Sequence, residues 1–253
     1  MSGVGNDRGQ QGERLRDYFE AQLLFADILA TRTGRPLADV CLSCTNLHRR
    51  LGLGRVEVDA QGSGWARYAA GLQPCASGDE RLAWTLRFFA EASPEEDVPQ
   101  RFGCFSYDLQ DGGRVIRIHF SNQDSADDCG PLALAKAARR RSELQEMFAH
   151  IRTHHPDARR VRGGSWLYNL AAYRRLFPPE YGASALVPDR VRLDGTSSWG
   201  QLLDFRGAVK PAVRQALLEN VRHVDVAAPW KAFPLRALAV ESAIELFYRH
   251  YDG

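Results

Sequence analysis

The stretch FGCFSYDLQDGGRVIRIHF, residues 102–120, decides the fold, because it is typical of two strands joined by a tight turn. Apolar and polar residues alternate with period two on both sides of the turn. Between the two runs, Asp111-Gly112-Gly113 suits the positive φ angles of a tight hairpin turn. The stretch therefore predicts a β-hairpin with strands over 102–109 and 114–120.

Alternation along the second strand divides its side chains between two faces. Ile116, Ile118 and Phe120 share the face expected to be apolar, and Arg117 and His119 share the other. His119 also lies just before an acidic loop, and nearby carboxylates favour imidazolium, so this histidine is a candidate general base. A histidine with a satisfied structural hydrogen bond is the plainer interpretation, and both stay open.

Helical and strand patterns alternate after the hairpin. A long helix should begin at Pro131 and end before Pro156, because proline fits a first helical turn and stops a helix elsewhere. The remaining expected elements are a strand at 159–163, a short helix at 170–177, strands at 187–193 and 198–205, and helices at 211–224 and 234–251.

The chain before the hairpin has a helical pattern. Apolar residues at helical spacing predict helices over 14–31 and 36–51, which would form a helical hairpin, and a short helix over 65–72. Ser77 followed by Glu80 is a capping-box signature, which predicts the start of another helix.

These patterns indicate an α+β (mixed α/β) fold class, with a helical N-terminal part followed by a mixed sheet flanked by helices. The polar, proline-bounded segment 93–99 is the expected boundary between the two. We therefore expect a disordered tail over 1–12, a helical region over 13–98 and a sheet-bearing region over 99–253. One continuous domain over 13–253 is the alternative. The tail is rich in Gly, Asn and Gln and lacks the apolar run of a signal peptide.

The composition is that of a soluble globular protein. Of the 253 residues, 44% are hydrophobic and 25% are charged, which excludes wholesale disorder. Thirty-three basic residues against 31 acidic ones give no global attraction to nucleic acid or to an anionic membrane. No apolar run approaches the ~20 residues that span a bilayer. Five cysteines, an odd number without an export signal, indicate reduced thiols and a cytoplasmic location.

The order of the expected elements resembles that of the GNAT-type acyltransferases. A local resemblance, over roughly residues 100–205, is to the C-terminal half of a group of acyltransferase-like bacterial proteins. It rests on Arg117-Ile118-His119-Phe120, the long helix, Ser165-Trp166-Leu167, Leu176-Phe177-Pro178 and Ser184. The whole chain also resembles an uncharacterised bacterial protein family. The GNAT resemblance implies a splayed sheet that holds acyl-CoA, or an acyl-carrier thioester, and transfers the acyl group to a small substrate.

The loop expected to hold the cofactor departs from the family pattern. GNAT enzymes place Arg/Gln-x-x-Gly-x-Gly/Ala before the helix that follows the fourth strand, and its N–H groups bind pyrophosphate. Here the corresponding loop, 121–130, contains three aspartates and no Lys or Arg, so it should repel a pyrophosphate. Arg49-x-x-Gly52-x-Gly54 fits the spacing, but it ends an expected helix, where glycines serve as caps.

The run Gly163-Gly164-Ser165-Trp166-Leu167-Tyr168-Asn169 is the second candidate site segment. Its two glycines allow close backbone approach, and Ser165 could act as a nucleophile or contact an anion. We expect His119, Ser165 and Tyr168 to be catalytic and Trp166 and Asn169 to bind substrate; Tyr173 is an alternative to Tyr168 as the acid of acyltransferases of this fold. Ser165 or Asn169 as a helix cap, with Trp166 and Tyr168 as packing residues, is the structural alternative.

Cys41-x-x-Cys44 with His48 places three possible metal ligands on one helical face. A closed zinc site needs about four ligands, and no second Cys-x-x-Cys pair is present, so we expect core packing and no metal.

The segment from Lys136 to Arg162 carries eight Lys or Arg against three acids, and His150, His154 and His155 add potential charge. A helix over 132–155 of this kind could bind an acidic protein or another anionic partner, which is the non-catalytic alternative for the whole chain. No aromatic-interleaved or groove-reading motif accompanies it, which argues against nucleic acid.

Overall fold

The structure, a computed structural model, describes residues 4–54, 62–92, 100–124 and 128–252. The chain forms two compact units, which are described separately. Unit 1 contains residues 1–96 and 190–234, and unit 2 contains residues 97–189 and 235–253. The expected boundary at 93–99 lies outside the described residues. The division differs from the expected one, because residues 190–234 return to the helical unit.

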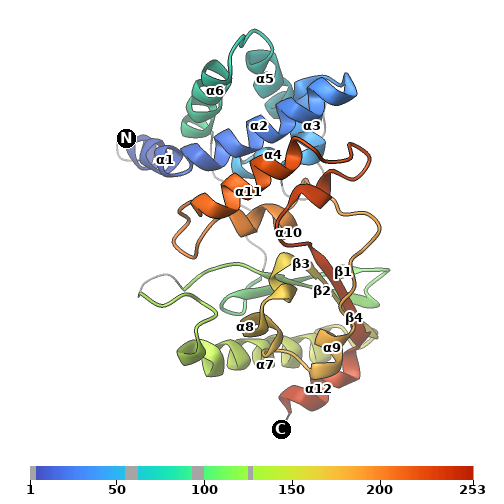
Figure 1. Cartoon of the computed structure of the whole chain (residues 1–253). Helices are drawn as coiled ribbons and strands as arrows, with labels where there is room; N and C mark the ends of the chain where they lie inside the picture. The colour runs from blue at the N-terminus through green and yellow to red at the C-terminus, as the bar shows by residue number, and fades with distance from the viewer. Residues whose placement is uncertain (1–3, 55–61, 93–99, 125–127, 253) are drawn as a thin grey trace. The chain divides into compact units, whose positions relative to one another are not determined.

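Unit 2 is built on a four-stranded mixed sheet in the order β1-β2-β3-β4 (Figure 1). Its strands are β1 (Phe105–Gln110), β2 (Val115–Phe120), β3 (Arg160–Ser165) and β4 (Leu238–Ala243). The outer pairs β1–β2 and β3–β4 are antiparallel, and the central pair β2–β3 is parallel. The fold class is therefore α+β, as the sequence predicts.

The predicted hairpin is confirmed. Strand β1 pairs with β2 from Phe105↔Phe120 to Gln110↔Val115. The turn between them has positive φ at three successive residues, Asp111 (52°), Gly112 (61°) and Gly113 (87°). Glycine adopts this region without a Cβ clash, and aspartate tolerates it better than most residues, which is why this sequence turns here.

Helices cover one face of the sheet, as Figure 1 shows for α7 (Ala137–His154), α8 (Ala171–Arg174), α9 (Pro179–Ala183) and α12 (Ile244–Tyr251). The short 3₁₀ helix η1 (Leu134–Lys136) leads into α7, and η2 (Trp166–Asn169) leads from β3 towards α8. Alternation in the strands directs apolar side chains to this face, where they meet the helices in one buried core. Its strand residues include Phe105, Ile116, Ile118, Val161 and Val240.

Three predictions for the second half are wrong. Residues 187–193 form no strand, and 198–205 contain the helical turns α10 (Thr196–Trp199) and η3 (Gly200–Leu202). The helix predicted from 234 to 251 is a strand, β4, followed by α12. The sequence of β4, LAVESA, has helix-forming residues, but pairing with all six residues of β3 overrides that preference.

Unit 1 is helical in its described part. Its helices are α1 (Val4–Arg14), α2 (Arg16–Thr33), α3 (Leu37–Cys44), α4 (Leu47–Arg50), α5 (Ser63–Leu72), α6 (Gly78–Glu91), α10, η3, α11 (Pro211–Val221) and the 3₁₀ helix η4 (Pro229–Ala232). The predicted capping box at α6 is present, because Ser77 accepts from the Glu80 N–H at 3.2 Å and Glu80 accepts from the Ser77 N–H. The predicted helix over 36–51 is broken at Thr45-Asn46 into α3 and α4.

In unit 1, the N-terminal segment differs from expectation, and Trp199 joins segments that are far apart in the sequence. Residues Val4–Arg14 form α1, where composition predicts a disordered tail; Arg8 stacks over the Phe89 ring of α6 at 4.5 Å. Trp199, fully buried, packs edge-on against Phe25 and Phe233, which explains why residues 190–234 belong to this unit.

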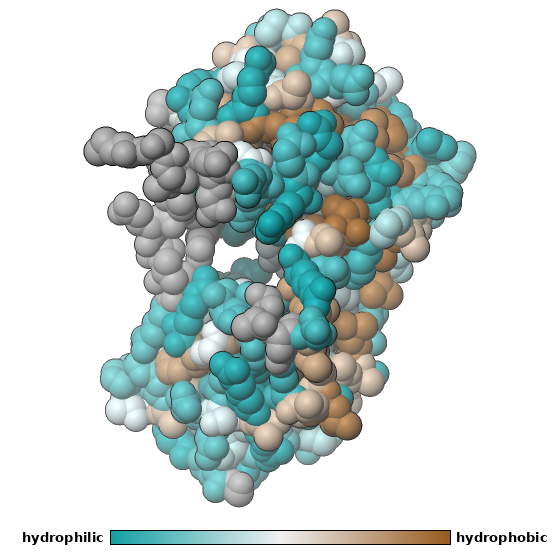
Figure 2. All heavy atoms as spheres, turned by 90° about the vertical axis from the view of Figure 1, so that its left-hand side faces the viewer, coloured by the Kyte–Doolittle hydropathy of each residue, from teal (hydrophilic) through white to brown (hydrophobic). Residues whose placement is uncertain are grey.

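Among the described residues, no helix is long and apolar enough to cross a membrane. Hydrophilic residues make up most of the face that Figure 2 presents.

Candidate functional site

The ladder between β2 and β3 is shorter than the strands themselves. Each strand has six residues, yet they pair over three positions, from Val115↔Arg160 to Arg117↔Arg162. Beyond these positions, residues 118–120 stay paired with β1 and residues 163–165 stay paired with β4. The two antiparallel pairs therefore separate at the carboxyl ends of β2 and β3. We call the unpaired residues 118–120 and 163–165 the splay.

In the splay, the backbone N–H and C=O groups of β2 and β3 do not form the hydrogen bonds that normally join parallel strands. In a parallel pair, each strand presents N–H and C=O groups to its neighbour at regular intervals. Residues 118–120 and 163–165 do not exchange such bonds with each other in the register of the described strands. An extended ligand with amide groups could pair with strand edges of this kind.

Three buried tyrosines lie behind the splay on its helical side. The Tyr168 and Tyr181 hydroxyls are 3.0 Å apart, and both rings are buried. Gly163 of the splay is in contact with them, since a Cβ at this position would lie 2.6 Å from Tyr181 Oη and closer still to Tyr168 Oη. Tyr173 packs edge-on against Tyr168, with ring centroids 5.1 Å apart. Gly163 is thus required here for lack of space.

Burial determines the protonation of this cluster. Removal from water raises the pKa of Tyr168, Tyr173 and Tyr181 well above the usual value, and the Tyr181 hydroxyl reinforces the shift for Tyr168. All three are therefore phenols at neutral pH. Of the two tyrosines considered from the sequence, Tyr168 is the one in contact with Gly163 of the splay.

His119 lies on the opposite face of the sheet, as alternation predicts. Its Nε2 is 2.8 Å from Asp108 Oδ2 on β1, and both side chains are partly exposed. Because a carboxylate can only accept, Nε2–H donates and Nδ1 keeps its lone pair whenever the ring is neutral. A carboxylate that fixes the tautomer in this way prepares the other nitrogen to accept a proton. Asp108 was not singled out by the sequence; its position diagonally across the hairpin could have been found from the register.

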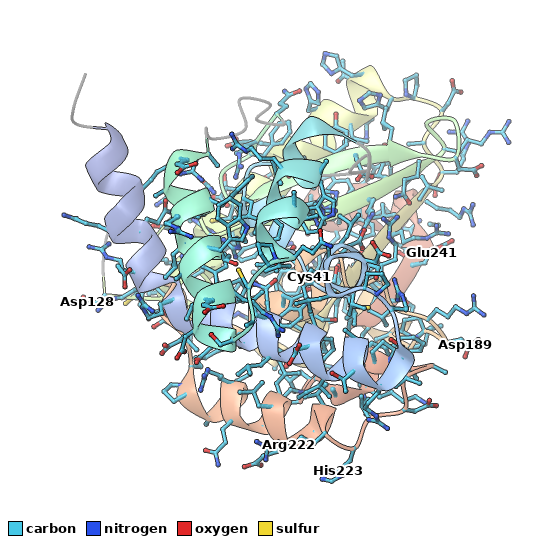
Figure 3. All side chains as sticks on the ribbon, turned by 90° about the horizontal axis from the view of Figure 1, so that it is seen from above. Cys41, Asp128, Asp189, Arg222, His223 and Glu241 are labelled. Carbon is cyan, nitrogen blue, oxygen red and sulfur yellow. The ribbon has the colours of Figure 1, made fainter. Side chains whose placement is uncertain are left out.

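The rest of this face carries an ion-pair network between β3 and β4. Glu241 of β4, labelled in Figure 3, accepts from Arg160 at 2.8 Å and pairs with Arg162 at 2.7 Å. The two arginines lower the pKa of Glu241 although its partial burial acts in the opposite direction. The face is thus polar and partly neutralised, in contrast to the helical side.

Ser165, Trp166 and Asn169 lie at the end of β3 and in η2. Ser165 caps η2 by accepting from the Leu167 N–H at 3.1 Å, as the structural alternative proposes. Asn169 is exposed and donates to the carbonyls of Trp166 and Arg236. Ser165 and His119 are themselves residues of the splay, and Tyr168 contacts Gly163 of the splay from the helical side. His119, which is bonded to Asp108, is on the opposite face of the sheet from Tyr168.

A buried ionic cluster at the start of α7 was missed by the sequence analysis. Arg140, fully buried, pairs with Asp124 at 2.9 Å and with Glu143 at 2.8 Å. Lys136 pairs with Asp124 at 3.1 Å, and Glu143 accepts from the Cys104 N–H at 3.0 Å. The bond from Lys136 is the first cause of the lowered pKa of Asp124. One of the three loop aspartates is therefore neutralised internally; residues 125–127 lie outside the described part.

Most of the charge on the predicted basic helix has internal partners. Lys136 and Arg140 belong to the buried cluster, Arg141 donates to the His250 carbonyl at 2.8 Å, and Arg152 pairs with Asp252 at 2.7 Å. Arg139 is 64% exposed but also lies 3.5 Å from Glu143. This leaves little unpaired positive charge for an anionic partner.

The Cys41-x-x-Cys44 motif of unit 1 packs in the core, as expected. Cys41, labelled in Figure 3, and Cys44 are buried free thiols, and burial raises the pKa of Cys41. His48 is buried too, which lowers its pKa to about 4. Within the part of the chain that the structure describes, no group of three or more His, Cys, Asp or Glu side chains is placed to hold a metal ion.

Unit 1 also has an open pocket of about 280 Å³. Val191, Leu193, Pro229 and Trp230 give it apolar walls, with Cys44 at its side. Its charged pair, Arg192 and Asp194, is mutually neutralised. Ser43 completes its polar lining, and the site residues predicted from the sequence belong to unit 2.

Comparison of the chain with protein-family models, with curated proteins and with solved structures gave no match.

Proposed function

We propose that unit 2 is a GNAT-like acyltransferase, which transfers an acyl group from a CoA or carrier thioester to a small nucleophilic substrate at the splay. The observation that carries the proposal is the three-position ladder between β2 and β3. Side chains on opposite faces of a continuous sheet cannot reach one ligand. A ligand between the separated strands would meet His119 from one face and, across Gly163, Tyr168 from the other.

The roles of the two residues follow from their surroundings. His119, held by Asp108, would accept the proton of the attacking amine or hydroxyl at Nδ1. The nucleophile would form a bond to the acyl carbon, and the carbon–sulfur bond would break. Tyr168, the candidate acid, stays a neutral phenol and would donate a hydrogen bond to the leaving sulfur, which takes its proton from solvent. His119 returns the proton that it gained to solvent, so atoms and charge balance.

Donor binding differs from the family pattern at the loop 121–130. Asp124 is neutralised within the ionic cluster, which reduces the repulsion expected for a pyrophosphate. Ser165, the last residue of the splay, and Trp166 and Asn169, which follow it in η2, would contact the acyl or acceptor group. The five cysteines are all free, which supports the cytoplasm as the place of this activity.

The test is thiol release from acyl-CoA and from acyl-carrier thioesters of several chain lengths, each with a panel of small amines. We expect release with one class of thioester, at least 100-fold slower in His119→Ala and about tenfold slower or worse in Tyr168→Phe. Asp157→Asn, an exposed carboxylate of the same unit, is the control and should match the wild type. Release at the buffer rate with both classes, or equal rates in wild type and His119→Ala, would overturn the proposal.

The non-catalytic alternative, a partner bound through the helix over 132–155, has weaker support because its cations are largely paired within the unit. Capture of a partner that is lost when the exposed Arg139 and Arg141 are changed to Glu, but kept in His119→Ala, would favour it.

A further inference from the structure

A pair of histidines at the end of α7 is not used by the proposed function. His150 and His154 lie one turn apart, and their rings stack with centroids 3.9 Å apart and planes 20° from parallel. His154 is exposed and His150 half-buried, so the pair is accessible from solvent. The adjacent His155 is engaged elsewhere, with its Nε2 2.8 Å from Tyr107 Oη.

The hydrogen bond of His154 fixes which of its nitrogens is available. Its Nδ1 is 2.9 Å from the carbonyl oxygen of His150, which can only accept, so Nδ1–H donates and Nε2 keeps its lone pair whenever the ring is neutral. Histidines that bind metals commonly donate their second ring N–H to a carbonyl in this way. His154 therefore already has the outer-shell bond of a metal ligand.

The helical spacing of the pair suits chelation, because side chains at i and i+4 are neighbours on one helix face. Tetrahedral zinc with nitrogen ligands at about 2.0–2.1 Å requires the two nitrogens to lie roughly 3.3 Å apart. The stacked rings lie in nearly parallel planes, so both accessible side chains must turn until one nitrogen of each is directed at the same ion.

Arg152, the arginine between the two histidines in sequence, has partners of its own. Arg152 pairs with Asp252 at 2.7 Å and stacks on the Tyr248 ring at 4.1 Å. The carbonyl end of α7, which carries partial negative charge, lies at the histidine pair. We propose that His150 and His154 chelate a divalent transition-metal ion of the imidazole-binding class, such as Zn²⁺ or Ni²⁺, with water completing the coordination.

The experiment is calorimetric titration of the tag-free whole chain with Ni²⁺ and, separately, with Zn²⁺. His150→Ala and His154→Ala should each weaken the strongest site by at least tenfold, while circular dichroism remains unchanged. His223→Ala is the matched control, because this histidine is exposed at the end of α11 in unit 1 (Figure 3). It should leave the affinity unchanged.

A second readout keeps the test independent of small affinity changes. Cu²⁺ bound at one equivalent should show electron paramagnetic resonance couplings from two imidazole nitrogens, and from fewer in either alanine variant. The proposal is overturned if the wild type fails to bind Ni²⁺ and Zn²⁺ at millimolar concentration. Equal affinities for the wild type and both alanine variants would also overturn it, as binding would then be adventitious.

Discussion

Replacing Gly163 by alanine tests the contact that holds Tyr168 behind the splay. The new Cβ would lie 2.6 Å from Tyr181 Oη and 2.7 Å from Tyr168 Cζ, against about 3.5 Å for an ordinary contact. The rings must therefore shift by about 1 Å. Overpacking of this kind costs about 1–3 kcal/mol. Loss of the 3.0 Å bond between the two tyrosines adds about 0.5–1.5 kcal/mol. We expect Gly163→Ala to destabilise unit 2 by about 1.5–4.5 kcal/mol in total.

The neighbouring glycine is the matched control. Gly164 is exposed on the other face of the sheet, and a Cβ there would meet nothing within 4 Å. Gly164→Ala should range from neutral to about 1 kcal/mol stabilising, because alanine restricts the unfolded chain. Urea unfolding gives the free energies, and hydrogen exchange of β3 peptides reports on unit 2 separately. A difference between the two variants below about 0.5 kcal/mol would refute the packing of Tyr168 against Gly163.

Three further predictions concern stability. Glu143→Gln removes the negative charge that pairs with buried Arg140 and should lower the free energy of urea unfolding by about 1–3 kcal/mol. Glu146→Gln, at an exposed position of the same helix, should change it by less than about 0.5 kcal/mol. Equal effects of the two variants would refute the buried ionic cluster. Ser77→Ala removes the cap of α6 and should cost about 1 kcal/mol by the same assay, and no loss would mean that the cap is not formed in solution. The pKa of His48 is about 4 in the folded chain and 6.5 ordinarily, so the unfolded state binds a proton at this residue first as the pH decreases. The free energy of unfolding should therefore fall between about pH 6.5 and pH 4. His48→Leu should flatten that part of the pH profile, and His223→Leu should not.

The parts of the fold that the sequence predicts correctly are those determined by local chemistry. The hairpin follows from Asp111-Gly112-Gly113, and the start of α6 follows from Ser77 and Glu80, since both depend on residues close in the chain. Strand β4 could not be recognised in this way, because its pairing with β3 joins residues more than seventy positions apart in sequence and opposes its helical preference.

The site was predictable to a similar extent. Alternation placed His119 correctly on the face opposite the apolar one, but the face occupied by Tyr168 depends on how η2 folds back onto Gly163. The neutralisation of Asp124 also escaped prediction, because Lys136 and Arg140 reach it from a helix that begins after the loop. A charge count of the loop alone could not reveal these partners.

The central claim, that a thioester binds between β2 and β3, is tested most directly by hydrogen exchange with a non-hydrolysable acyl-thioether analogue. Binding at the splay would pair the backbone of residues 118–120 and 163–165 with the ligand. The account predicts slower exchange of these amides at saturating analogue, with little change in α11 of unit 1. Unchanged exchange at the splay, or protection confined to other segments, would contradict it.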